Sequence, residues 1–257
     1  MADRKTVILD AGHGGRDNGA VYEDQIEKND NLRIVLALGQ ELEDRGIEVY
    51  YTRTTDVFQT PFEKAEIANE TGADAFLSIH RNSSPNPAEY AGVEALVYKK
   101  EGLALELADN IVGALGLVGF EEIGVSERPG IIVLRKTKMP AVLAEIGFIN
   151  QPEDTKLLEE NFKQVVGALA DAVQGTLEPG MAASGTDGFY RVEIARTTER
   201  KMATKEARRA VEQGFPSSIE RKDGRYSVCI GRYQELDNAV LMERVLKSRG
   251  YVTRILG

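Results

Sequence analysis

The first two thirds of the chain alternate between two hydrophobic periods. Short apolar runs, typical of buried strands, are separated by segments whose apolar residues recur every three to four positions, as on one face of a helix. The strand-like runs are 6–10, 47–53, 75–80, 92–98, 131–135 and 141–148. The helix-like segments are 31–45, 62–70, 102–117 and 152–177.

This alternation predicts right-handed crossovers between strands that run mostly parallel in one sheet. Helices should cover both faces of that sheet, so the predicted fold class is α/β. In open sheets of this kind, ligands bind beyond the carboxyl ends of the strands. We therefore expect functional side chains where the apolar strands end.

A change of composition divides the chain. Residues 178–187 lie in a stretch of Gly, Pro, Ser, Thr and Ala without periodicity, which is typical of a flexible linker. Residues 188–257 then predict the order βαββαβ, with Asp223-Gly224 as a hairpin turn. The sequence thus predicts a large domain at 1–177 and a small α+β domain at 188–257.

Charge divides at the same boundary. The chain has 32 Lys+Arg and 41 Asp+Glu, a net charge of -9. Residues 188–257 hold 15 basic and 9 acidic residues, a balance of +6, which leaves 17 and 32, a balance of -15, for residues 1–187. Such asymmetry suggests that the small domain meets an anionic or extended polar partner.

Composition excludes several classes of protein. The single cysteine, Cys229, excludes an internal disulfide scaffold. No apolar run approaches the ~20 residues of a membrane span, so we expect no membrane partner. The charged segment 1–7 is unlike a secretory signal peptide, so we expect the chain to be made in the cytoplasm.

Four polar residues stand at or near the ends of the apolar runs. His13 follows the first strand in a glycine-rich turn, and His80 ends the strand 75–80. Glu145 interrupts an apolar strand, where an unpaired carboxylate is costly to bury unless the strand is an exposed edge. Glu27 precedes a helix, where a capping role is the alternative to a functional one.

Two imidazoles and a carboxylate, with a vacant fourth position, are typical of a hydrolytic Zn²⁺ site. Zinc lowers the pKa of its bound water, and a second glutamate that is not a ligand can take the proton. The residues alone leave open which of Glu27 and Glu145 is the ligand and which the base. No HExxH motif occurs, so a helix-borne zincin site is excluded.

Over roughly residues 5–175 the sequence resembles the zinc-dependent N-acetylmuramoyl-L-alanine amidases of the amidase 3 family. The motifs that carry the resemblance are ILDAGHGGRDNGA (8–20), EKNDNL (27–32), ADAFLSIHRN (73–82) and VLRKTKMPAVLAEIGFIN (133–150). The resemblance implies one zinc ion held by His13, Glu27 and His80, with Glu145 as the catalytic glutamate. It also implies a mixed sheet and hydrolysis of the amide between N-acetylmuramic acid and L-alanine in peptidoglycan.

Two positions depart from the family pattern. Lys64 stands where the family usually has an arginine, and the segment 126–130 replaces a loop that usually carries an Arg-Gly pair. Neither belongs to the metal set, so we expect these departures to affect the substrate cleft.

The C-terminal residues 188–257 resemble a SPOR-type peptidoglycan-binding module, chiefly through 189–192 and 226–233. This resemblance implies a sheet that binds glycan strands. We expect peptidoglycan as the partner and no nucleic acid, with release to the wall by lysis of a sporulating mother cell or by phage-induced lysis. The resemblance therefore implies either an autolysin or a phage endolysin.

Two other interpretations compete with this one. The first is a zinc amidase or carboxypeptidase that acts on a different amide. The second is a non-enzymatic RNA-binding protein, since a βαββαβ fold with positive charge also suits RNA. The strongly acidic large domain and the lack of an RNP-like aromatic pair oppose the second.

Overall fold

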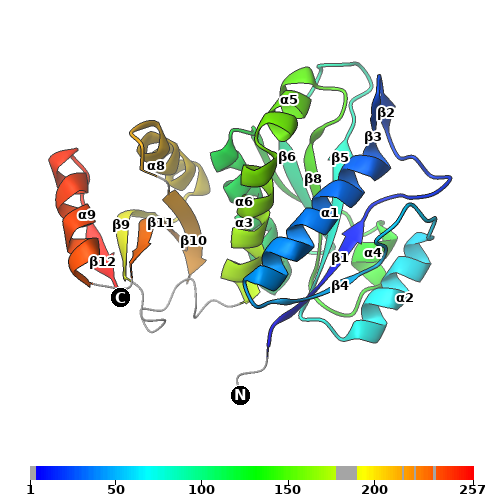
Figure 1. Cartoon of the computed structure of the whole chain (residues 1–257), viewed down its shortest axis with the longest axis horizontal. Coiled ribbons are helices and arrows are strands. Elements are labelled where there is room, and N and C mark those ends of the chain that lie inside the picture. Colours follow the sequence, from blue (N-terminus) through cyan, green and yellow to red (C-terminus); the bar gives the residue numbers. More distant parts are fainter. Residues whose placement is uncertain (1–3, 178–189, 216, 223, 234–235) are drawn as a thin grey trace. The chain divides into compact units, whose positions relative to one another are not determined.

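The computed structural model describes residues 4–177, 190–215, 217–222, 224–233 and 236–257 (Figure 1). The chain divides into two compact units, Met1–Val173 and Gln174–Gly257, and each is described by itself. The linker expected at 178–187 lies outside the described residues, so the expected domain boundaries stay predictions.

A six-stranded mixed sheet forms the centre of the first unit. Its strands are β1 (Thr6–Ala11), β4 (Glu48–Tyr51), β5 (Ala75–Asn82), β6 (Val93–Val97), β7 (Glu122–Glu127) and β8 (Ala141–Phe148). Their order is β4-β1-β5-β8-β6-β7. Strands β4, β1, β5 and β8 run parallel, while β6 pairs antiparallel with β8 and parallel with β7. The expected mixed, mostly parallel sheet is confirmed.

Helices flank both faces of this sheet. They are α1 (Glu27–Asp44), α2 (Pro61–Thr71), α3 (Gly102–Val118), α4 (Ile132–Lys136), α5 (Pro152–Glu160) and α6 (Phe162–Leu177). On one face, Phe76 of β5 packs in a core cluster with residues of α2 and α4. Arg81 of the same strand points to the other face, where it contacts Asp30 of α1 and Thr155 of α5. A short ribbon of β2 (Val21–Tyr22) and β3 (Gln25–Ile26) precedes α1.

Local signals define the ends of α2. The Thr60 hydroxyl accepts a hydrogen bond from the Glu63 backbone N–H at 3.2 Å, and the Glu63 carboxylate accepts from the Thr60 N–H at 2.6 Å. This reciprocal cap satisfies two donors that the helix cannot satisfy itself. The helix ends at Thr71 and is capped by Gly72, whose φ of 66° is the left-handed conformation that glycine adopts without strain.

The prediction of a strand at 131–135 is wrong, because these residues form helix α4. Their β-branched side chains favour a strand. In the fold, however, Val133 and Leu134 pack into the same core cluster as Ala68 of α2. Arg135 and Lys136 occupy the last helical turn, where positive charge interacts favourably with the helix dipole. Tertiary packing therefore overrides the local strand preference.

The single helix expected over 152–177 is instead two helices, α5 and α6. The break falls at Asn161, whose side-chain amide donates to the Leu157 carbonyl at 3.2 Å. Asparagine competes with helical hydrogen bonding in this way. Strand β7 is not predicted by the sequence pattern, because its residues are partly exposed and include a glycine and two glutamates.

The second unit contains an antiparallel sheet. Its described elements are β9 (Tyr190–Thr197), α8 (Arg200–Glu212), β10 (Ser217–Lys222), β11 (Arg225–Tyr233), α9 (Leu236–Ser248) and β12 (Arg254–Leu256). The strand order is β10-β11-β9-β12, and the order along the chain is the βαββαβ that the sequence predicts. No helix within the described ranges is both long enough and apolar enough to cross a membrane.

Candidate metal centre

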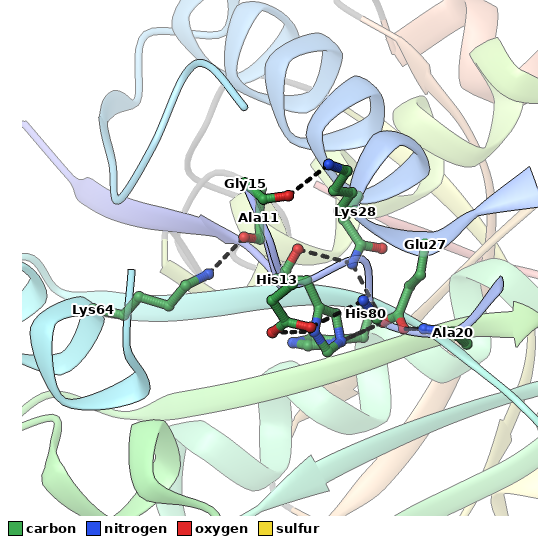
Figure 2. A network of polar contacts seen from close by, with 12 residues as sticks. Ala11, His13, Gly15, Ala20, Glu27, Lys28, Lys64 and His80 are labelled. Atoms are coloured by element: carbon green, nitrogen blue, oxygen red, sulfur yellow. Dashed lines mark hydrogen bonds and ion pairs between the residues drawn. The ribbon is translucent and has the colours of Figure 1, made fainter. Parts of the chain in front are cut away.

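His13, Glu27 and His80 come together near the carboxyl ends of β1 and β5, where His80 is a residue of β5 and Glu27 is the first residue of α1 (Figure 2). One ligand atom from each residue lies within 4.8 Å of the others. Glu27 Oε1 lies 3.2 Å from His13 Nε2 and 2.9 Å from His80 Nδ1. The structure therefore brings together the three residues that the resemblance assigns as metal ligands.

The glycine-rich turn after β1 sets the position of His13. His13 has a φ of 60°, which is uncommon outside glycine. Gly14 and Asp17 exchange backbone hydrogen bonds of 2.9 and 3.1 Å, which close the turn. A Cβ atom on Gly12 would lie 2.3 Å from His80 Cε1. Glycine at position 12 is therefore required for the two histidines to lie this close.

Asp17 orients the His13 ring. Its Oδ2 lies 2.8 Å from His13 Nδ1, and its Oδ1 accepts from the Gly19 N–H at 3.1 Å. A carboxylate on one ring nitrogen fixes the tautomer and leaves the other nitrogen for a metal. Here the nitrogen left is Nε2, which faces Glu27. The hydrophobic pattern does not indicate Asp17, although a carboxylate four residues after a histidine in a glycine-rich turn is a usable signal.

Glu27 is held at the start of α1 by groups from three segments. Its Oε2 accepts from the Ala20 N–H at 2.8 Å. Its Oε1 accepts from the Asn31 side chain at 3.3 Å and from the Arg81 N–H at 3.2 Å. The carboxylate thus faces the histidines, so a capping role alone does not explain it.

The centre is electrostatically prepared for a cation. Burial raises the pKa of Glu27, but hydrogen bonds and charge interactions with His13 and His80 lower it more, to well below its usual range. Burial lowers the pKa of His13, but the carboxylates of Glu27 and Asp17 raise it more, to about 9. A proton on His13 therefore balances the Glu27 carboxylate in the metal-free protein.

Two buried cationic side chains bind backbone carbonyls where β1 ends and the turn begins. Arg53 donates to the carbonyls of Ala11 at 2.9 Å and Gly12 at 3.0 Å. Lys64 Nζ lies 2.6 Å from Asp10 Oδ1. It also donates to the Ala11 carbonyl at 2.6 Å (Figure 2). Lys64 is 4% exposed. Lys64 therefore holds the end of β1, from which the His13 turn begins.

Glu145 lies beside this cluster. It is the register partner of His80 on the neighbouring parallel strand, so both side chains project from the same face. Strand β8 lies between β5 and β6, so the alternative of an exposed edge strand is wrong. Burial chiefly raises the pKa of Glu145, to about 7; the carboxylates of Glu27 and Glu94 add to this, and His80 opposes it. Its buried Oε2 has no hydrogen-bond partner within the described part of the chain.

These residues fit Zn²⁺. Two imidazole nitrogens and one carboxylate oxygen form the donor set of many zinc hydrolases, which keep a further position open for water or substrate. Glu145 Oε2 is a buried acceptor beside that donor set. The four positions thus have the chemistry of a metal centre with an adjacent base.

Comparisons with known proteins identify a family that the sequence matches. Residues 7–175 match the family described as N-acetylmuramoyl-L-alanine amidase. The sporulation-specific N-acetylmuramoyl-L-alanine amidase of Bacillus subtilis (strain 168) is 32% identical over 223 residues, which cover 84% of this chain and 85% of that protein. The endolysin of Bacillus phage SPP1 is 35% identical over 165 residues, which cover 61% of this chain and 59% of that protein.

A solved structure extends the likeness to the fold. The crystal structure of an N-acetylmuramoyl-L-alanine amidase from Clostridium difficile 630 matches with a TM-score of 0.65 and 30% sequence identity. The match covers 69% of this chain and 98% of that one. The chain belongs to the N-acetylmuramoyl-L-alanine amidase family.

Proposed function

We propose that this family member hydrolyses the amide between N-acetylmuramic acid and the L-alanine of the peptidoglycan stem peptide, with one zinc ion held by His13, Glu27 and His80. Family membership supports peptidoglycan hydrolysis. The observation that carries the residue assignment is the convergence of those three side chains with Glu145 beside them.

Each side chain has a defined part in this reaction. When bound, zinc polarises the substrate carbonyl and lowers the pKa of water. Glu145 accepts the proton of the attacking water and passes it to the nitrogen of the leaving L-alanine. Asp17 keeps the proton on His13 Nδ1, so that Nε2 stays available as a ligand. Asn31 and the Ala20 N–H hold the Glu27 carboxylate in place.

Paired substitutions separate the ligand role from the base role. Glu145→Gln should keep one zinc per chain by elemental analysis and lose at least about 100-fold in kcat on a soluble muramoyl-L-alanine substrate. His80→Ala should instead lose both zinc and activity, because it removes a ligand. Full activity in Glu145→Gln, or full zinc content in His80→Ala, would contradict these assignments.

For the second unit, we propose a SPOR-like module that binds peptidoglycan glycan strands. Its antiparallel sheet contacts both α8 and α9 in the βαββαβ order, and residues 188–257 carry an excess of positive charge. The alignment with the sporulation-specific relative covers 84% of the chain, so it reaches beyond the unit Met1–Val173. We propose that the enzyme reaches the wall after lysis of the cell that makes it.

A further inference from the structure

A second acidic side chain, Glu94, extends the row that His80 and Glu145 begin across the sheet. Glu94 of β6 lies directly opposite Glu145 of β8 in their antiparallel pairing. Directly opposite residues project from the same face of a sheet, and His80 is the partner of Glu145 on its other side. With strands about 4.8 Å apart, Glu94 lies one strand beyond the proposed base, on the side away from the metal centre.

Arg128 is the basic partner of Glu94. It follows β7, and its backbone N–H donates to the Val97 carbonyl at 2.8 Å. Its Nη2 lies 3.6 Å from Glu94 Oε1, and its Nη1 donates to the Glu127 carbonyl at 3.1 Å. The Glu94 side chain is 13% exposed and that of Arg128 is 50% exposed. A largely buried carboxylate thus holds a guanidinium that is half open to solvent.

The solvent-exposed part of the Arg128 guanidinium can bind a second carboxylate. Arginine presents a planar fork of donors that binds carboxylates in a bidentate manner, and more than one acceptor can share it. Arg128 lies in the segment 126–130, where the sequence departs from the family pattern. Arg128 is none of the residues proposed to hold zinc or to act as the base, so a role for it lies outside the metal centre.

The spacing between strands β8 and β6 agrees with the length of the proposed substrate. The scissile amide must lie between the metal centre and Glu145. An extended peptide advances by about 3.5 Å per residue, so a group on the residue after L-alanine lies roughly 7 Å from the scissile bond. The Glu94–Arg128 pair begins about 4.8 Å beyond Glu145, which brings the guanidinium within reach of that group.

We propose that Arg128, positioned by Glu94, binds the free α-carboxylate of the stem-peptide residue that follows L-alanine. The enzyme then prefers stem peptides in which this carboxylate is free over those in which it is amidated. This inference rests on the proposed amidase reaction. The C-terminal carboxylate of a longer stem peptide has the same chemistry, so the test must separate the two sources.

The test measures how fast the zinc-loaded full chain cleaves three soluble N-acetylmuramoyl peptides. One substrate has a free α-carboxylate on a second-position D-glutamate, one carries the amide there, and one has only its C-terminal carboxylate amidated. The wild type should have a kcat/KM about tenfold higher for the first than for the second, mainly through KM, and should cleave the third like the first. In Arg128→Ala, the ratio of kcat/KM for the first substrate to that for the second should fall close to one. Arg128→Lys should restore part of the wild-type preference.

Two further variants sharpen the result. Glu94→Gln should lower the ratio of kcat/KM for the first two substrates, but by less than Arg128→Ala does. The double variant should lower this ratio no further than Arg128→Ala alone, because Glu94 acts through the arginine. Arg33→Ala is the matched control, since Arg33 is also a partly exposed, ion-paired arginine but pairs with Glu159. Its ratio should equal that of the wild type.

An unchanged ratio in Arg128→Ala would overturn this inference, as would an equal loss on the first two substrates. A preference that follows the C-terminal carboxylate would overturn it as well. Failure of the wild type to cleave any of the three substrates would instead overturn the proposed function on which the inference rests.

Discussion

At the scale of single residues, the centre depends on one carboxylate that is shared by two imidazoles. Glu27 Oε1 faces His13 Nε2 and His80 Nδ1, while Asp17 holds the opposite nitrogen of His13. Without a metal, a proton on His13 takes the place of the cation. Metal binding must displace that proton, so zinc affinity and pH are linked.

This linkage predicts a pH-dependent stability in the metal-free protein. The folded-state pKa of His13 is raised from 6.5 to about 9. The protonated His13 ring therefore stabilises the folded protein fully below pH 6.5, and this stabilisation is lost as pH rises through 9. In excess chelator, urea unfolding should show the free energy of unfolding falling by up to about 3 kcal/mol across this window. His13→Gln should show a much flatter profile. An identical slope in both proteins would contradict the assignment.

Some of these residues are easier to predict from the sequence than others. His13, His80 and Glu145 stand out because a polar side chain at the end or middle of an apolar strand is costly without a function. Glu27 was ambiguous, because a carboxylate near a helix start has an ordinary capping role. Asp17 was missed because it acts on another side chain across a tight turn, whose shape does not follow from hydrophobic periodicity.

At the scale of elements, a buried ion pair ties α2 to the end of β1. Asp10 is 1% exposed and accepts hydrogen bonds from Lys64, Ser78 and Thr52, each at 2.6 Å. Burial raises the pKa of Asp10, but Lys64 and the two hydroxyl groups lower it more. The pair therefore holds the strand from which the His13 turn begins.

Removal of one partner of the buried Asp10–Lys64 pair should lower the free energy of unfolding. Lys64→Met leaves Asp10 buried without its cation, and we expect a loss of about 3 to 5 kcal/mol in the free energy of unfolding by urea titration. The control is Lys5→Met, which removes the more exposed pair with Asp74 and should cost less than about 1 kcal/mol. Equal losses in the two variants would refute the structural role of the buried pair.

Two elements, α4 and β7, do not follow from the local sequence pattern, each for its own reason. Helix α4 has β-branched residues and becomes a helix because its apolar face packs against α2. Strand β7 lies at the sheet edge, where partly exposed residues give no clear alternation. Strongly periodic segments such as α1 were predicted, because burial of one face determines both their periodicity and their structure.

At the scale of the whole molecule, the first unit should act without the second. The matched amidase structure of Clostridium difficile 630 is covered over 98% of its length by 69% of this chain. A chain ending at Leu177 should therefore keep its kcat/KM on small soluble substrates within about twofold. Its binding to insoluble wall should weaken by about 100-fold, because the tethered module no longer raises the local substrate concentration. Equal sedimentation of both chains with purified wall would refute a binding role for the second unit.

We propose that His13, Glu27 and His80 hold one zinc ion and that Glu145 beside them is the base in hydrolysis of the N-acetylmuramoyl-L-alanine amide. Mass spectrometry of purified peptidoglycan digested by the zinc-loaded protein identifies the bond that is cleaved. We predict free stem peptides with an L-alanine amino terminus and uncut glycan strands, and neither product from Glu145→Gln. Glycan fragments, peptides cut at another bond, or the same products from Glu145→Gln would contradict the account.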